Sequence, residues 1–196
     1  MKVKRLSLIG SLRVLVRLTL TILMGVSLVV CTSTAPSPST ITEAAISLTS
    51  KSFTDGSTIP VKYTCRGENV SPPLIWEGVP SVSKSLVLIM DDPDAPVKDF
   101  THWVVFNLPP DSLELPEGIP GDERLSNGAL QGNNGAMQIG YFGPCPPPGG
   151  PHHYNFVMYA LDTILDLDAG ASKQQVLSAM EGHIIGRGQL VGIYQQ

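Results

Sequence analysis

Residues 143–154, with the sequence GPCPPPGGPHHY, restrict most strongly what this chain can fold into. Three consecutive prolines fix φ and remove three backbone donors, so this stretch can form neither a helix nor a central strand. The flanking glycines permit positive φ and close approach by another group. We expect a stiff loop that delivers imidazole and phenol side chains to the start of a strand, beside a small binding pocket. A proline-stiffened surface turn is the alternative interpretation.

The N-terminus has the features of an export signal. Residues 1–17 carry five basic side chains and no acidic one, and an apolar run over residues 18–30 follows. This run is too short for a membrane span but suits the core of a signal peptide. It ends at Cys31, with Leu28 three residues before it, which resembles a bacterial lipoprotein signal cleaved ahead of a lipidated cysteine. Val30 departs from the pattern, since such signals usually carry Gly, Ala or Ser there.

We therefore expect residues 1–30 to be a lipoprotein-type signal peptide and Cys31 to carry a lipid that tethers an exported protein to a membrane. A plain exported protein and an uncleaved anchor are the alternatives. Residues 31–42 are rich in Ser, Thr and Pro and predict a flexible tether, and the folded domain is expected over residues 43–196.

Removal of the signal changes the charge of the chain. Without residues 1–30, eight basic residues stand against 17 acidic ones, a net charge of −9. This balance argues against nucleic acid as a partner, because no basic stripe remains to meet phosphates. If the pocket binds an anion, local donors must overcome an unfavourable overall field.

The hydrophobic pattern predicts a mostly β (α+β) fold, sandwich-like, with a few short helices near the C-terminus. A capping-box spacing at Ser172 and Gln175 predicts a helix that ends near Gly182. Residues 109–140 are expected to be a functional loop or to carry short helices. Strands are predicted over residues 45–53, 59–65, 74–76, 86–90, 102–108, 153–161 and 187–194.

Two cysteines remain once Cys31 is set aside as the lipid carrier. An exported protein meets an oxidising environment, in which Cys65 and Cys145 can form a disulfide. Two free buried thiols are the competing interpretation.

An acidic turn follows the predicted strand over residues 86–90. Asp91, Asp92 and Asp94 lie within four residues, and their mutual repulsion requires nearby donors or water. Pro93 and Pro96 hold this turn in one shape, and His102 opens the next strand shortly afterwards. A solvated acidic turn and a merely packed histidine are the alternatives.

Three motifs in this order resemble the phosphatidylethanolamine-binding protein family, in its bacterial Raf-kinase-inhibitor-like branch. They are DPDAP at 92–96, HWVVFN at 102–107 and GPCPPPGGPHHY at 143–154, and residues 63–74, 131–134 and 182–194 also match. The resemblance covers roughly residues 43–195. It implies a central antiparallel sheet packed on a smaller one, with a shallow anion pocket at one end.

The resemblance also implies which residues form that pocket. The ligand-binding set is Asp92, His102, Gly143, Cys145, Pro146, His152 and Tyr154. The supporting set is Pro93, Asp94, Pro96 and His153. His153 stands where the family usually has Arg, and strand alternation places it on the face opposite His152 and Tyr154. Cys145 takes a position where relatives outside bacteria often have Gly, which fits a bridge to Cys65.

The chemistry of these side chains suits a phosphate group. Protonated His102 or His152 and the hydroxyl of Tyr154 are donors for phosphate oxygens. Asp92 would repel an anion, so we expect it to accept a hydrogen bond from a histidine, raise the pKa of that ring and fix its tautomer. Binding is then expected to weaken as pH rises through the histidine pKa.

We expect an exported binding protein for phosphate-type anions or phospholipid headgroups, with no catalysis, cofactor or metal. One alternative is an inhibitor of a kinase or protease that captures a protein partner through the same pocket. Another is a metal-dependent hydrolase built from Asp92, Asp94, His102 and His152, although no close-spaced H-E-x-x-H ligand pair supports it. A serine hydrolase lacks support, because the chain has no G-x-S-x-G motif.

Overall fold

The computed structural model describes residues 43–97 and 99–196. The chain divides into two units, Met1–Ser39 and Thr40–Gln196, and the fold reported below is that of the second. The predicted signal peptide, the lipid on Cys31 and the tether over residues 31–42 lie outside the described residues. Within the described part, no helix is long and apolar enough to cross a bilayer.

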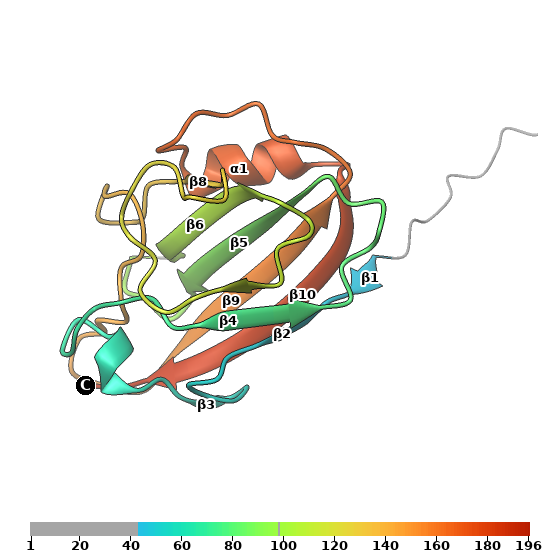
Figure 1. Ribbon diagram of the computed structural model, residues 1–196. Coiled ribbons are helices and arrows are strands. Elements are labelled where there is room, and N and C mark those ends of the chain that lie inside the picture. Colours follow the sequence, from blue (N-terminus) through green and yellow to red (C-terminus); the bar gives the residue numbers. More distant parts are fainter. Residues whose placement is uncertain (1–42, 98) are drawn as a thin grey trace, which may run out of the picture. The chain divides into compact units, whose positions relative to one another are not determined.

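Two β-sheets form the framework (Figure 1). The seven-stranded sheet has the order β1-β10-β9-β5-β6-β8, and β3 also pairs with β10. Its strands are β1 (Ala44–Ala45), β3 (Ser57–Thr58), β5 (Ser85–Asp92), β6 (Phe100–Leu108), β8 (Leu130–Gln131), β9 (His152–Leu161) and β10 (Ile184–Tyr194). The three-stranded sheet contains β2 (Ser47–Thr49), β4 (Leu74–Glu77) and β7 (Glu114–Leu115). All pairs are antiparallel except those that β1 and β3 make with β10, so the predicted two-sheet, mostly β fold is confirmed.

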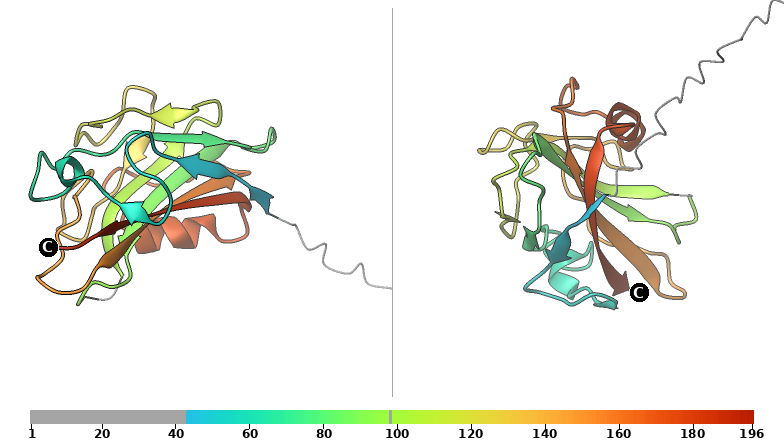
Figure 2. Two further views of the ribbon diagram at one scale, coloured as in Figure 1. Left: turned by 90° about the horizontal axis from the view of Figure 1, so that it is seen from below. Right: turned by 90° about the vertical axis from the view of Figure 1, so that its right-hand side faces the viewer.

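The large sheet is covered on both faces. On β5, Leu86, Leu88 and Met90 pack in the core with residues of the small sheet, whereas Val87 and Ile89 pack in a second core with helix α1 (Lys173–Met180). Figure 2 shows the helix and the small sheet on opposite sides of the large one. Because successive side chains of a strand point to opposite faces, a strand buried on both is apolar throughout, as the sequence of β5 is.

Helix α1 begins where the sequence predicts. The Ser172 hydroxyl accepts from the Gln175 amide, and the Gln175 side chain accepts from the Ser172 amide, which completes a capping box. Beyond the helix, Gly182 takes φ +78°, a conformation that glycine adopts at little cost.

The prediction of a strand over residues 59–65 is wrong. Ile59 still donates to the carbonyl of Ile193, but Pro60 has no donor to continue the ladder. The chain turns into the 3₁₀ helix η1 (Val61–Tyr63), closed by bonds from Tyr63 and Thr64 to the carbonyls of Pro60 and Val61.

Three other expectations need correction. The single strand predicted over residues 45–53 is two short strands, because β1 pairs with β10 and β2 pairs with β4. Residues 109–140 carry the short strands β7 and β8 instead of helices. Finally, α1 is the only α-helix in the described ranges, where a few short helices had been expected.

Antiparallel pairing places the chemistry-bearing motifs at one end of the large sheet. Asp92, the last residue of β5, pairs with Phe100 at the start of β6, and Asp91 pairs with Asn155 near the start of β9. The acidic turn, His102 and His152 therefore meet at this end.

Candidate functional site

A cavity of about 170 Å³ lies at this end of the large sheet. Its polar lining groups are Asp92 and two imidazoles, and aromatic and proline rings make up most of the rest. The lining residues are Asp92, Ala95, Pro96, Val97, Phe100, His102, Phe142, Cys145, Pro146, Pro147 and His152. Six predicted site residues are thus brought together there. Two others of the ligand-binding set, Gly143 and Tyr154, are buried and do not line it.

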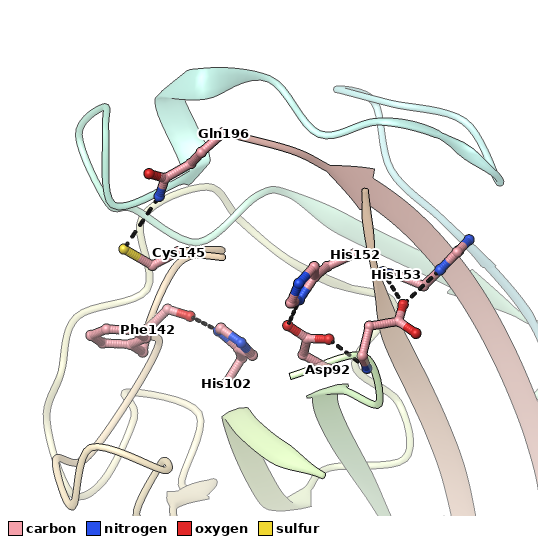
Figure 3. A network of polar contacts seen from close by, with 8 residues as sticks. Asp92, His102, Phe142, Cys145, His152, His153 and Gln196 are labelled. Atoms are coloured by element: carbon pink, nitrogen blue, oxygen red, sulfur yellow. Dashed lines mark hydrogen bonds and ion pairs between the residues drawn. The ribbon is translucent and has the colours of Figure 1, made fainter. Parts of the chain in front are cut away.

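Asp92 and His152 form a buried pair beside the cavity (Figure 3). The Nδ1 atom of His152 donates to Oδ2 of Asp92 over 2.7 Å, and Asp92 is 3% exposed. The other carboxylate oxygen, Oδ1, accepts from the backbone amide of Asp94 at 2.9 Å. The carboxylate of Asp92 therefore accepts from a histidine, as expected, and leaves Nε2 of His152 as the ring nitrogen free to meet a ligand.

Each carboxylate of the acidic turn has its own partner, which resolves their mutual repulsion. Asp91 forms a 2.8 Å ion pair with Lys173 of α1, and Oδ2 of Asp94 accepts from both the backbone amide and Nδ1 of His153. These bonds to His153 hold the pKa of Asp94 below its usual value. His153 is exposed and contacts the turn instead of lining the cavity, as its strand position predicts.

His102 lies at a register shift in the pairing of β5 and β6. Met90 pairs with Trp103 and Asp91 pairs with Thr101, so no residue of β5 pairs with His102. Such an extra residue changes the direction of its side chain. His102 is instead bound to Phe142: its carbonyl accepts from the Phe142 amide at 2.9 Å, and its Nδ1 lies 2.6 Å from the Phe142 carbonyl.

The environment of His102 differs from the one expected for a cationic donor. Burial lowers the pKa of His102, and this effect exceeds the opposing effects of the Phe142 carbonyl and the nearby carboxylates of Asp92 and Asp91. Because a carbonyl only accepts, Nδ1 carries the hydrogen, and the neutral ring presents Nε2 as an acceptor. The prediction that His102 supplies a protonated donor is therefore corrected for neutral pH.

Tyr154 lies behind the cavity, against both imidazoles. Its ring centroid is 5.1 Å from that of His102 in an edge-on contact and 6.5 Å from that of His152 in a stacked one. Its side chain is fully buried, and its hydroxyl has no hydrogen-bond partner among the described residues. Burial, helped by the negative charge of Asp92, raises the pKa of Tyr154, so the hydroxyl keeps its proton.

The proline-rich wall of the cavity is fastened to the loop after η1. Cys65 and Cys145 form a disulfide with their Cα atoms 5.4 Å apart, and the Cys65 amide donates to the Pro144 carbonyl. Between these elements, the Gly143 amide donates to Oδ1 of Asn69. A Cβ atom on Gly143 would come within 2.6 Å of that oxygen and of the Tyr63 carbonyl, so only glycine fits.

Sequence reasoning missed the aromatic lining of the cavity and the anchor at Asn69. Phe100 and Phe142 pack against the His102 ring, with centroids 4.9 and 5.9 Å away. A signal was available for Phe100, which precedes His102 by two residues on the same strand. Asn69 takes φ +57°, which Asn tolerates better than most residues, but nothing local to it points to Gly143.

The residues proposed for the metal-dependent alternative do not form a metal site. Within residues 43–97 and 99–196, no three side chains of His, Cys, Asp or Glu are arranged to hold a metal ion. Asp94 is engaged by His153, and Nδ1 of His102 by a carbonyl. The donor set therefore does not fit the metal-dependent hydrolase.

Comparison with known proteins identifies the family. The family model described as phosphatidylethanolamine-binding protein matches residues 49–195. A UPF0098 protein of Methanothermobacter thermautotrophicus is 56% identical over 77% of this chain and 99% of its own. The candidate lipoprotein LppC of Mycobacterium tuberculosis is 38% identical over 83% of this chain and 77% of its own.

Solved structures agree with this match. Escherichia coli YbcL, described as a member of the mammalian PEBP family, superposes with a TM-score of 0.71 at 32% identity, covering 77% of this chain and 98% of its own. The PEBP homologue CT736 of Chlamydia trachomatis also has a TM-score of 0.71, at 44% identity over 78% of this chain and 98% of its own. The chain belongs to the phosphatidylethanolamine-binding protein family, in the branch that includes YbcL.

Proposed function

We propose that this protein binds a phosphate-bearing ligand, free or as the headgroup of a phospholipid, in the cavity between His102 and His152. The observation that carries the proposal is a pair of ring nitrogens on the cavity lining that have no partner in the described structure: Nε2 of His102 and Nε2 of His152. Polar atoms on a buried lining are usually paired, because leaving one unpaired costs about 1–3 kcal/mol. Ligand atoms would pair with them.

The cavity is small and its polar groups are held in place, as a pre-formed binding site requires. Asp92 holds the ring of His152, Phe142 holds that of His102, and the disulfide fixes the proline-rich wall. His152 acts as the donor in this proposal, and it acts locally against the net negative charge of the chain. We propose a binding role without catalysis or a cofactor.

The proposed location is outside the cytoplasm. An export signal over residues 1–30 and a lipid on Cys31 would tether the domain to a membrane surface. The similarity to LppC, named as a candidate lipoprotein, supports this assignment. A disulfide at the cavity wall is also consistent with an oxidising compartment.

Calorimetric titration of the unit Thr40–Gln196 with phosphate and with phosphoethanolamine, near pH 6 and near pH 8, tests the proposal. We expect saturable binding that is tighter at the lower pH. The matched variants are His152→Ala and His153→Ala, neighbours on opposite faces of β9. The first is expected to lower affinity at least about tenfold, as loss of a charge-assisted hydrogen bond does, and the second to change it little.

Absence of binding at both pH values would contradict the proposal. It would favour the protein-level inhibitor, in which the same cavity captures a segment of a partner, and capture of partner proteins would be the next experiment. Equal loss of affinity in the two variants would place the ligand elsewhere.

A further inference from the structure

The cavity offers an acceptor where an anion site is expected to offer only donors. Nδ1 of His102 lies 2.6 Å from the carbonyl oxygen of Phe142, and a carbonyl cannot donate. The hydrogen therefore belongs to Nδ1, and the neutral ring carries a lone pair on Nε2. No residue in the described part of the chain donates to Nε2, so a ligand that contacts this atom must itself supply the hydrogen.

The charged groups around His102 do not overturn this assignment. The charges of Asp91 and Asp92 on β5 and of His152 on β9 act on the ring, and Tyr154 of β9 packs against it. The two carboxylates favour the protonated ring, but burial favours the neutral one more strongly, and the pKa of His102 is lowered as a result. At pH 6.5 and above, the neutral ring predominates.

The charge of the cavity also limits the charge of its ligand. Asp92 is one of the lining residues, and none of the described lining residues is Lys or Arg. A second negative charge on the ligand would be repelled by the Asp92 carboxylate, and among the described lining residues His152 is the group placed to offset it. A singly charged oxyanion fits this field better than a doubly charged one.

We propose that the cavity selects a singly charged oxyanion that still carries a proton, a phosphate monoester or phosphonate in its P–OH form, over the phosphodiester of a phospholipid headgroup. This inference rests on the proposed function and narrows it. The P–OH group donates to Nε2 of His102, and another oxygen of the ligand accepts from Nε2 of His152 when that ring is protonated. A phosphodiester has the same single charge but no hydrogen to donate.

The decisive test compares two ligands of like shape and charge, only one of which has a hydrogen to donate. Methylphosphonate and methanesulfonate have the same shape, and near pH 6.5 both are singly charged, but only the phosphonate has a donor. In calorimetric titrations of Thr40–Gln196, we expect methylphosphonate to bind at least about tenfold more tightly, because the sulfonate leaves the acceptor of His102 unpaired. Dimethyl phosphate, which mimics the phospholipid diester, is expected to bind as weakly as methanesulfonate.

Measuring affinity at higher pH distinguishes loss of the ligand's proton from titration of the protein. As methylphosphonate loses its second proton it loses its donor and gains a charge, so its advantage over methanesulfonate is expected to disappear by about pH 8.5. A phosphate monoester, whose second pKa is about 6, should lose its advantage at lower pH. A fall in affinity of equal size for all ligands would instead report titration of the protein and contradict the inference.

The other outcomes are equally distinct. Equal affinities for methylphosphonate, methanesulfonate and dimethyl phosphate near pH 6.5 would overturn the inference and leave the proposed anion site standing. Failure of all three to bind would overturn the proposed function and the inference with it. Nitrogen-15 NMR of the imidazoles in the unsubstituted protein supplies a check without any variant, since a proton on Nε2 of neutral His102 would also overturn the inference.

Discussion

The imidazole of His152 donates from Nδ1 to Oδ2 of Asp92 over 2.7 Å, and both side chains are almost fully buried. The same carboxylate accepts from the amide of Asp94, so one side chain orients the histidine and closes the acidic turn. The pair therefore connects the shape of the cavity rim to the direction of a ligand-facing ring.

Replacing Asp92 tests this double role. An amide oxygen can accept, but the amide nitrogen cannot, so Asp92→Asn loses one of the two bonds that the carboxylate accepts. We expect the free energy of unfolding to fall by about 1–3 kcal/mol, measured by urea denaturation. The matched variant Asp94→Asn changes the half-exposed pair of Asp94 and His153, and we expect it to lower the free energy of unfolding by less than about 1 kcal/mol. Equal costs would show that the buried pair has no special structural role.

The hydroxyl of Tyr154 is expected to matter little for folding or for ligand binding. Tyr154→Phe removes a buried group that has no partner in the described structure, so the free protein should be as stable as the unsubstituted one or more stable by up to about 1 kcal/mol. Affinity for phosphate should change little, because the hydroxyl lies behind the lining of the cavity. Urea denaturation and calorimetry measure the two effects separately.

A second tyrosine is the control for this variant. The hydroxyl of Tyr141 donates to the Tyr63 carbonyl at 2.7 Å, away from the lining of the cavity. Tyr141→Phe should lose about 1 kcal/mol in stability, because its hydroxyl has a partner, and should also change affinity little. If both variants lose the same stability, the Tyr154 hydroxyl has a partner in the folded protein.

The disulfide between Cys65 and Cys145 is expected to stabilise the domain and to hold the wall of the cavity. It links residues 80 positions apart, and cross-links over loops of that length typically contribute about 2–4 kcal/mol. We expect the double variant Cys65→Ser, Cys145→Ser to unfold at lower urea and to bind phosphate more weakly. A reductant should bring the unsubstituted protein to the same state and leave the double variant unchanged.

The start of α1 provides a test of local structure that does not involve the site. Ser172→Ala removes the side-chain half of the capping box, and we expect a loss of about 1 kcal/mol in unfolding free energy. Ser178→Ala, on an exposed position of the same helix, should cost nothing, because alanine favours the helix. Thermal or urea unfolding of both variants checks the difference.

The parts of the fold that the sequence predicts well have local causes. The apolar runs of β5 and β6 and the capping box at Ser172 determine their own structure, and each lies where it was expected. The strand prediction over residues 59–65 failed because Pro60 has no amide hydrogen to donate, so the chain cannot continue the ladder with β10 beyond Ile59. One missing donor outweighed the strand propensity of the residues that follow.

Part of the cavity lining was predicted from the sequence, but its protonation was not. The family resemblance brought Asp92, His102 and His152 together correctly, and all three lie near strand ends that antiparallel pairing joins. Which histidine bonds to the Asp92 carboxylate depends on how the strands pair, and the register between two strands cannot be read from either strand alone. The neutral state of His102 follows from the burial of its ring.

The lowered pKa of His102 predicts how stability depends on pH in the ligand-free protein. The folded state resists protonation of this ring, whereas an unfolded chain takes up the proton near its ordinary pKa of 6.5. The contribution of His102 to stability is therefore complete above pH 6.5. It is lost as pH falls from there through the folded-state pKa, with a slope of at most about 1.4 kcal/mol per pH unit.

His102→Asn isolates this effect, because the amide nitrogen of Asn can replace Nδ1 as donor to the Phe142 carbonyl but does not titrate. Urea unfolding at intervals between about pH 7.5 and pH 5 should show a steeper loss of stability in the unsubstituted protein than in the variant. Identical slopes would mean that His102 is protonated in the folded state as readily as in the unfolded chain. The acceptor at Nε2, on which selection of a protonated ligand depends, would then be absent at mildly acidic pH.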